Sequence, residues 1–129
     1  CDIAVANTYY LARLARSDDP ADQAVVEAIN VILPNQDDRG VHVNISGAGV
    51  LTHSPNPDNA VAFLEFLASD EVQLAFAEGN NEWPVVDGIA HATVLDDLYG
   101  DFVQDDVNPA VFGGNRKDAL RIMEANGWK

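Results

Sequence analysis

Two adjacent tyrosines near the start of the chain, Tyr9 and Tyr10, are the residues most capable of chemistry. The apolar run at residues 3–6 precedes them and predicts a short strand buried on both faces. Asn7 and Thr8 favour a helix start, because their short side chains can accept hydrogen bonds from free backbone N–H groups. The two phenols therefore fall in the first turn of a predicted helix, at the carboxyl end of a strand, where open α/β sheets bind ligands.

Paired phenols at such a position suit a hard cation. A phenol ionises near pH ~10 in water, and a bound trivalent cation would promote ionisation far more than the positive end of a helix dipole. Phenolate is an anionic oxygen, which is the ligand type that hard cations prefer. The simpler interpretation of the dipeptide is that both rings pack where the helix meets the sheet, so the residues alone leave both interpretations open.

Composition narrows the class of protein. The chain has 129 residues, enough for one small domain or part of a larger one, and 47% of them are apolar. The net charge of −14 argues against nucleic acid as a partner, because phosphates would be repelled. One cysteine excludes an internal disulfide and a cysteine-based metal cluster. His42, His53 and His91 lack the spacing of a metal-binding motif.

Hydrophobic periodicity predicts a mixed α/β chain with more helix than strand. Alternation at 41–45 predicts a strand, and Gly47 and Gly49 after it fit either a hinge or ligand-facing turn, or a tight crossing inside a core. The helices at 59–69 and 71–78 are expected to form an αα-hairpin with its aromatic residues in the core. The other predicted helices cover 9–16, 21–32, 93–99 and 117–126.

No pattern indicates an enzyme. Gly113 and Gly114 precede a predicted helix but lack the phosphate-loop pattern, and Asp101, Asp105 and Asp106 lack the spacing of a calcium loop. A nucleophile–base signature is also missing from the sequence. Tyr9 and Tyr10 therefore remain the candidate site residues.

The order of these pieces resembles the second half of the bacterial ferric-iron-binding proteins of ABC importers, within the class II periplasmic solute-binding superfamily. Four stretches carry the likeness and together span essentially the whole chain in family order. They are residues 1–10 (CDIAVANTYY), 38–51 (DRGVHVNISGAGVL), 59–84 (with FLEFL and EGNNEWP) and 119–128 (ALRIMEANGW).

The resemblance implies an α/β chain that is part of a two-lobed, class II periplasmic-binding-protein-like fold, with the N-terminal half absent from this sequence. Residues 1–40 would be the remainder of the second lobe, 41–44 a hinge strand, and 45–129 the returning, mostly helical part of the first lobe. A fragment of this kind is expected to expose apolar surface that the missing half normally buries.

The function implied is binding. Tyr9 and Tyr10 would be metal ligands that capture Fe³⁺ as phenolates in the interlobe cleft, with or without a synergistic anion. The further ligands would come from the remaining N-terminal half of the same protein. The closed form would deliver iron to an ABC permease in the inner membrane, from the periplasm. Arg13, one turn after Tyr9, is expected to be solvated.

Three alternatives stay open. A relative in the same superfamily could carry a small organic or anionic solute, with the phenols stacking on it or hydrogen-bonding to it. An enzyme could use one phenol as a general acid, although no neighbouring base is apparent. An interaction module could bury Tyr9 and Tyr10 in its core.

Overall fold

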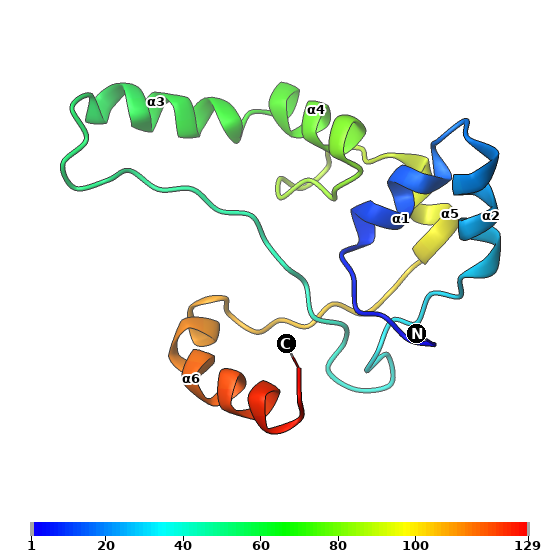
Figure 1. Cartoon of the computed structure of the whole chain (residues 1–129). Coiled ribbons are helices and arrows are strands. Elements are labelled where there is room, and N and C mark those ends of the chain that lie inside the picture. The colour runs from blue at the N-terminus through cyan, green and yellow to red at the C-terminus, as the bar shows by residue number, and fades with distance from the viewer. Residues whose placement is uncertain (1, 129) are drawn as a thin grey trace. The chain divides into compact units, whose positions relative to one another are not determined.

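The computed structural model describes residues 2–128, which contain six helices (Figure 1). Two compact units divide the chain: one comprises residues 1–33 and 47–101, and the other comprises 34–46 and 102–129. Cys1 and Lys129 lie outside the described residues. The helices are α1 (Thr8–Ala15), α2 (Pro20–Ala28), α3 (Pro57–Leu67), α4 (Asp70–Asn80), α5 (Thr93–Tyr99) and α6 (Ala110–Ala125).

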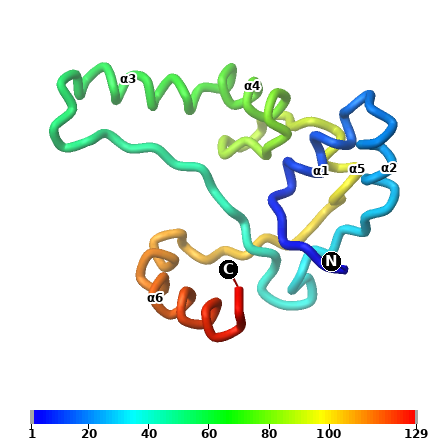
Figure 2. Tube along the Cα trace, in the orientation of Figure 1, coloured from blue at the N-terminus to red at the C-terminus, as the bar shows by residue number. Residues whose placement is uncertain are grey.

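Helix α1 packs against α2 and α5 in the first unit, as the trace in Figure 2 shows. Small and apolar side chains make this contact possible. Ala12 of α1 and Leu95 of α5 are fully buried, and so is Ala77 of α4. A buried alanine lets two helix backbones approach closely, so α1 is seated by its neighbours on this face.

Capping residues mark the start of α2 and the end of α4. Asp19 caps α2, where its carboxylate accepts a hydrogen bond from the Ala21 N–H at 2.8 Å, and Pro20 follows at the first helical position. Asn81 ends α4 in the left-handed conformation with φ of 57°. Asparagine tolerates this conformation better than most residues. The predicted helix at 21–32 ends earlier, since the backbone at Ile29 is already extended.

The predicted strands do not form within the described residues. Residues 3–6 belong to no strand, and Ile3 and Val5 are 81% and 84% exposed, where burial on both faces was expected. The segment 41–45 contributes one isolated parallel bridge, from Val41 to Gln104. The physical reason is that a strand exists only when a neighbour accepts and donates its backbone hydrogen bonds.

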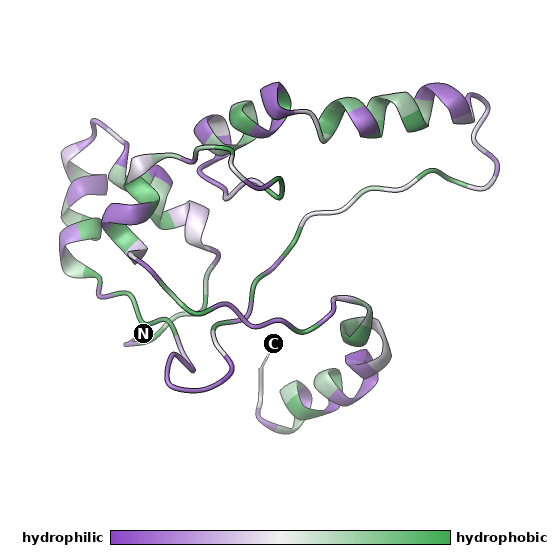
Figure 3. Ribbon diagram, turned by 180° about the vertical axis from the view of Figure 1, so that it is seen from behind, coloured by the Kyte–Doolittle hydropathy of each residue, from purple (hydrophilic) through white to green (hydrophobic). Residues whose placement is uncertain are grey.

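The predicted αα-hairpin is also not observed. Helices α3 and α4 follow one another end to end in Figures 1 and 3 and do not fold back side by side. Phe63 and Phe66 are 57% and 53% exposed, so they are not core residues of this chain. The short connection at Ala68 and Ser69 permits a hairpin, but no neighbouring apolar surface among residues 2–128 draws the helices together.

The second unit is organised by a close backbone approach at Gly40. Its φ is +94°, and a Cβ there would lie 2.6 Å from the carbonyl carbon of Gln104. The Val41 N–H donates to the Val103 carbonyl at 2.9 Å, and the Asp105 N–H donates to the Val41 carbonyl at 2.9 Å. The Gln36 amide adds two bonds to the backbone of Val103. Glycine is required here because any side chain would separate the two segments.

Helix α6 begins seven residues before the predicted start at Lys117 and passes through Gly113 and Gly114. Each glycine inside a helix costs about 1 kcal/mol relative to alanine, which is why the sequence suggested a break there. The Asn108 side chain satisfies the Ala110 N–H at 2.9 Å, which helps the helix start early. Gly127 ends it with φ of 71° and the pair of backbone bonds typical of a Schellman motif.

Apolar side chains remain exposed along several elements. The hydropathy colouring in Figure 3 shows hydrophobic residues along α3 and α6. Leu51 is 80% exposed, Ile122 64% and Trp128 59%. This exposure agrees with the expectation drawn from the sequence. A Cβ at Gly47 or Gly49 would meet no atom within 4 Å, so neither glycine marks a tight crossing in this chain.

We predict that Gly40→Ala destabilises the second unit, because the new methyl group meets the backbone of Val103 and Gln104 at a positive φ. The left-handed conformation alone costs about 1–2 kcal/mol per non-glycine residue. Hydrogen exchange should report loss of protection at the Val41 and Asp105 amides. Gly47→Ala is the matched control and should leave both amides protected, since space around Gly47 is open. Equal exchange in the two variants would contradict the prediction.

Candidate functional site

Tyr9 and Tyr10 lie in the first turn of α1, as the sequence predicts. Their ring centroids are 4.3 Å apart and the ring planes make an angle of 43°. Tyr10 is 51% exposed, and Tyr9 is partly buried. The two phenols therefore form an adjacent pair that solvent or a ligand can reach, and within this chain they are not core residues.

The hydroxyl groups of the pair are electrostatically unequal. The hydrogen bond with Tyr10, followed by that of the Asn7 amide, lowers the pKa of Tyr9 below the ordinary value of a phenol. The same hydrogen bond, together with the charge that Tyr9 develops, raises the pKa of Tyr10. Tyr9 therefore ionises first, and the resulting phenolate accepts a hydrogen bond from its neighbour.

Asn7 and Arg13 complete the surroundings of the pair. Asn7 occupies the N-cap position, but its amide donates to the Tyr9 hydroxyl at 3.4 Å and makes no capping bond. Arg13 is exposed, as expected, and its positive charge lowers the pKa of both phenols as a smaller contribution. Local charge thus favours an anionic oxygen at this helix N-terminus.

The histidines and carboxylates of the described residues are further side chains that could bind a metal. Among residues 2–128, no group of three histidine, cysteine or acidic side chains is arranged to hold a metal. His42 packs edge-on against Phe112, and His91 contacts Asp96 at 2.8 Å. The carboxylate of Asp105 pairs with Arg39 at 3.3 Å.

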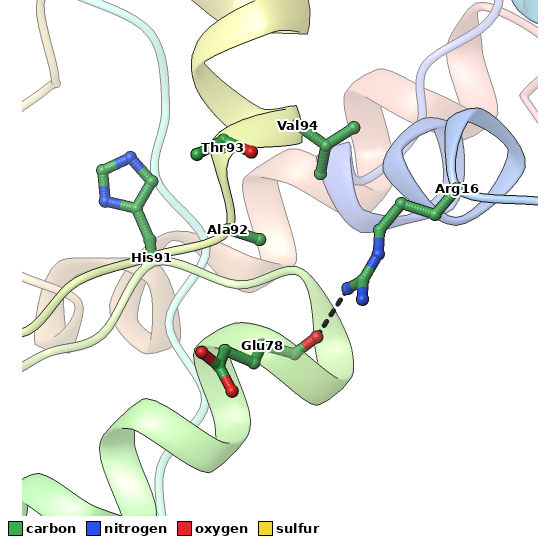
Figure 4. A pocket seen from close by; sticks show the side chains of 6 residues that line it. All are labelled: Arg16, Glu78, His91, Ala92, Thr93 and Val94. Carbon is green, nitrogen blue, oxygen red and sulfur yellow. Dashed lines mark hydrogen bonds between the residues drawn. The ribbon is translucent and has the colours of Figure 1, made fainter.

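A pocket of about 400 Å³ lies elsewhere in the first unit (Figure 4). The guanidinium of Arg16 reaches across it and donates to the Glu78 carbonyl at 2.6 Å and to the Asn81 side chain at 2.7 Å. The tyrosine pair does not line this pocket. Arg16 thereby ties the end of α1 to the end of α4, which is a structural role. The lining residues are Arg16, Glu78, His91, Ala92, Thr93 and Val94.

One contact to the site was not apparent from the sequence. The hydroxyl of Tyr99, the last residue of α5, donates to the Thr8 carbonyl at 2.6 Å. The two residues are 91 positions apart, so no local pattern connects them. A third tyrosine in a short helix is the one signal the sequence offered.

Comparison with known proteins identifies the family. The family model of the bacterial extracellular solute-binding proteins matches residues 2–109. The chain belongs to this family. Family members bind solutes, which confirms the expectation that the chain is not an enzyme. None of the helices in residues 2–128 has both the length and the apolar character needed to cross a membrane.

Individual relatives are iron proteins. Iron uptake protein A2 of Synechocystis is 49% identical over 130 residues, which cover 99% of this chain and 37% of the relative. The major ferric iron-binding protein of Neisseria meningitidis serogroup B is 38% identical over 128 residues, with the same coverage of both chains. The resemblance to ferric-iron-binding proteins is thereby confirmed.

Solved structures of ferric-iron-binding proteins resemble the chain as well. A Trichodesmium protein (IdiA, FutA) in complex with iron and citrate matches with a TM-score of 0.88 and 51% identity, over 96% of this chain and 39% of that one. The ferric binding protein from Campylobacter jejuni matches with a TM-score of 0.87 and 36% identity, over 98% of this chain and 40% of that one. The expected fold class is confirmed: the chain is a helix-rich part of the class II solute-binding fold and spans under half of these relatives.

We predict that Tyr10→Phe raises the pKa of Tyr9, because the variant removes the hydrogen bond that contributes most to lowering it. A pH titration followed by NMR of ¹³C-labelled tyrosine rings resolves each phenol. Asn7→Ala serves as a comparison. It removes the Asn7 hydrogen bond, which lowers the pKa of Tyr9 less than the Tyr10 hydrogen bond does, so the pKa of Tyr9 should rise by less than in Tyr10→Phe. A Tyr9 pKa that stays constant or falls in Tyr10→Phe would contradict this electrostatic assignment.

Proposed function

We propose that this chain supplies two ligands, Tyr9 and Tyr10, to the ferric-iron site of a solute-binding component of an ABC importer. The observation that carries the proposal is the adjacent, accessible phenol pair at the start of α1, in a chain 49% identical to an iron uptake protein. Phenolates are hard oxygen ligands, so they favour Fe³⁺ over softer metal ions.

The unequal pKa values support this role. Fe³⁺ must displace a proton from each phenol that it binds, and a lowered pKa makes the first displacement easier. Tyr9 would therefore bind the ion first. Once the cation is in place, its charge would favour loss of the second proton from Tyr10. The pair thus offers a stepwise route from hydrated ion to bis-phenolate.

The remaining ligands would come from polypeptide that the relatives have and this sequence does not contain. The resemblance places residues 1–40 in the second lobe, 41–44 in the hinge and 45–129 in the first lobe. Because α1 and α5 pack together within one compact unit, we propose that residues 93–99 lie in the same lobe as the tyrosine pair. Closure of the lobes would enclose the ion. Citrate accompanies iron in the Trichodesmium structure, and an anion of that kind would be a suitable synergistic ligand here.

The family also suggests the setting. An extracellular solute-binding protein of a bacterial importer works in the periplasm and delivers its cargo to an inner-membrane permease. We include the periplasmic location and the delivery to a permease in the proposal for this protein. The acidic net charge of −14 would attract cations generally, but no carboxylate is assigned as an iron ligand.

The test is a visible absorption titration with chelated Fe³⁺ near neutral pH. The protein is a chimera in which this chain replaces the matching segment of iron uptake protein A2, so that the rest of the fold is present. We expect a saturable, broad visible band from iron–phenolate charge transfer. Tyr9→Phe and Tyr10→Phe should each weaken and shift the band, and the double variant should abolish it.

His53→Gln is the matched control, because it removes an exposed side chain that could bind metal without contributing a phenolate. This variant should keep the band unchanged. A chimera without any band would refute the iron proposal and favour a small organic or anionic solute. A band that survives the double Tyr→Phe variant would place the phenolate ligands elsewhere.

A further inference from the structure

The direction in which Tyr9 and Tyr10 point is set by the first turn of α1. This helix has eight residues, and isolated helices shorter than about 12 residues are marginal in water. Tertiary contacts must therefore hold the turn in place. One fully buried residue, Ala12, anchors the middle of the helix. The two ends are fixed by polar contacts.

The carboxyl end of α1 is held by two side chains. Arg16 donates to the Glu78 carbonyl and to Asn81. Gln23 of α2 donates from its amide to the carbonyls of Leu14, Ala15 and Ser17, at 3.3, 3.1 and 2.6 Å. These contacts satisfy carbonyl groups that every helix leaves free at its C-terminus. They lie at the end of the helix opposite the phenol pair.

The amino end of α1 is held by Tyr99. Its hydroxyl donates to the Thr8 carbonyl at 2.6 Å, a short distance for an O–H···O bond. This carbonyl belongs to the peptide unit that joins Thr8 to Tyr9. Fixing the orientation of that peptide fixes where the Tyr9 side chain leaves the backbone. Tyr99 therefore acts one covalent step away from the candidate ligand.

Tyr99 is itself well supported. It ends α5, which packs on α1 and contains the fully buried Leu95. The indole ring of Trp83 lies 5.7 Å from the Tyr99 ring at an angle of 58°. Burial raises the pKa of Tyr99, so its hydroxyl keeps the proton that it donates to Thr8. The donor is therefore packed against a neighbouring ring and stays protonated at neutral pH.

We propose that Tyr99 is a positioning residue, which binds no iron and orients the Tyr9/Tyr10 pair through the peptide bond between Thr8 and Tyr9. The metal-binding part of this inference rests on the proposed function, whereas the positioning part rests on the contacts of the metal-free chain. Outer contacts that orient ligands typically change metal affinity by about 10–100-fold when they are removed. Because Tyr99 acts through a single backbone carbonyl, we expect a change in iron affinity near the lower end of this range, about tenfold.

The first arm of the test needs no metal. Tyr99→Phe removes one hydroxyl and keeps the ring that packs against Trp83. NMR of the metal-free protein with ¹³C-labelled tyrosines should show the Tyr9 and Tyr10 ring resonances shifted and broadened. Gln23→Met is the matched control, because it loosens the opposite end of the same helix. In that variant both ring resonances should stay in place.

The second arm uses the same two substitutions in the iron uptake protein A2 chimera. In competition with a chelator, Tyr99→Phe should bind Fe³⁺ about tenfold more weakly, and the charge-transfer band should shift. Gln23→Met should keep the affinity and the band of the parent. A merely structural role for Tyr99 would not separate the two variants in this way.

The outcomes distinguish the two claims. Unchanged tyrosine resonances in Tyr99→Phe, or equal changes in both variants, would overturn the positioning role. A parent chimera without a visible band would refute the iron function, and the metal-free arm would still decide whether Tyr99 orients the pair. Loss of the band in Tyr99→Phe with intact Tyr9 and Tyr10 resonances would also overturn the proposal, since it would make Tyr99 a ligand.

Discussion

A single hydrogen bond, from the Tyr99 hydroxyl to the Thr8 carbonyl, links the start of α1 to α5, and the geometry of the candidate site depends on that link. An eight-residue helix gains too little from its own backbone bonds to hold one orientation in water. Burial of Ala12 lets α1 approach its neighbours closely, but one small apolar side chain fixes no direction. Polar contacts at the two ends remove that freedom, because hydrogen bonds are directional and van der Waals packing is not.

Tyr9 and Tyr10 differ in pKa because they are neighbours. Two phenols with the same intrinsic acidity are separated in pKa because one donates a hydrogen bond and the other accepts it. In the proposed iron site, an arriving ion would meet one phenol whose pKa is lowered and one whose pKa is raised.

Helix positions were largely predictable from local chemistry, and strand positions were not. Asp19 and Pro20 indicate the start of α2, and Gly127 indicates the end of α6, because capping involves groups only a few residues apart. The apolar run at 3–6 has the composition of a strand, yet Ile3 and Val5 are exposed here. A strand needs partners distant in sequence, and the solved relatives are more than twice as long as this chain. The predicted αα-hairpin is also not formed, because two helices pack side by side only when they share an apolar surface, and that surface can depend on segments distant in sequence.

The sequence alone determined the family, the helix-rich composition and the candidacy of Tyr9 and Tyr10, because residue types, their order and short-range spacing are local properties. Only the tertiary structure decided that the two rings lie 4.3 Å apart with unequal pKa values, and that Tyr99 supports them from 91 residues away. It also showed why Gly40 must be glycine, since the backbone that excludes a side chain there belongs to residues 103 and 104. Contacts between distant segments depend on how the whole chain packs, and no local pattern encodes them.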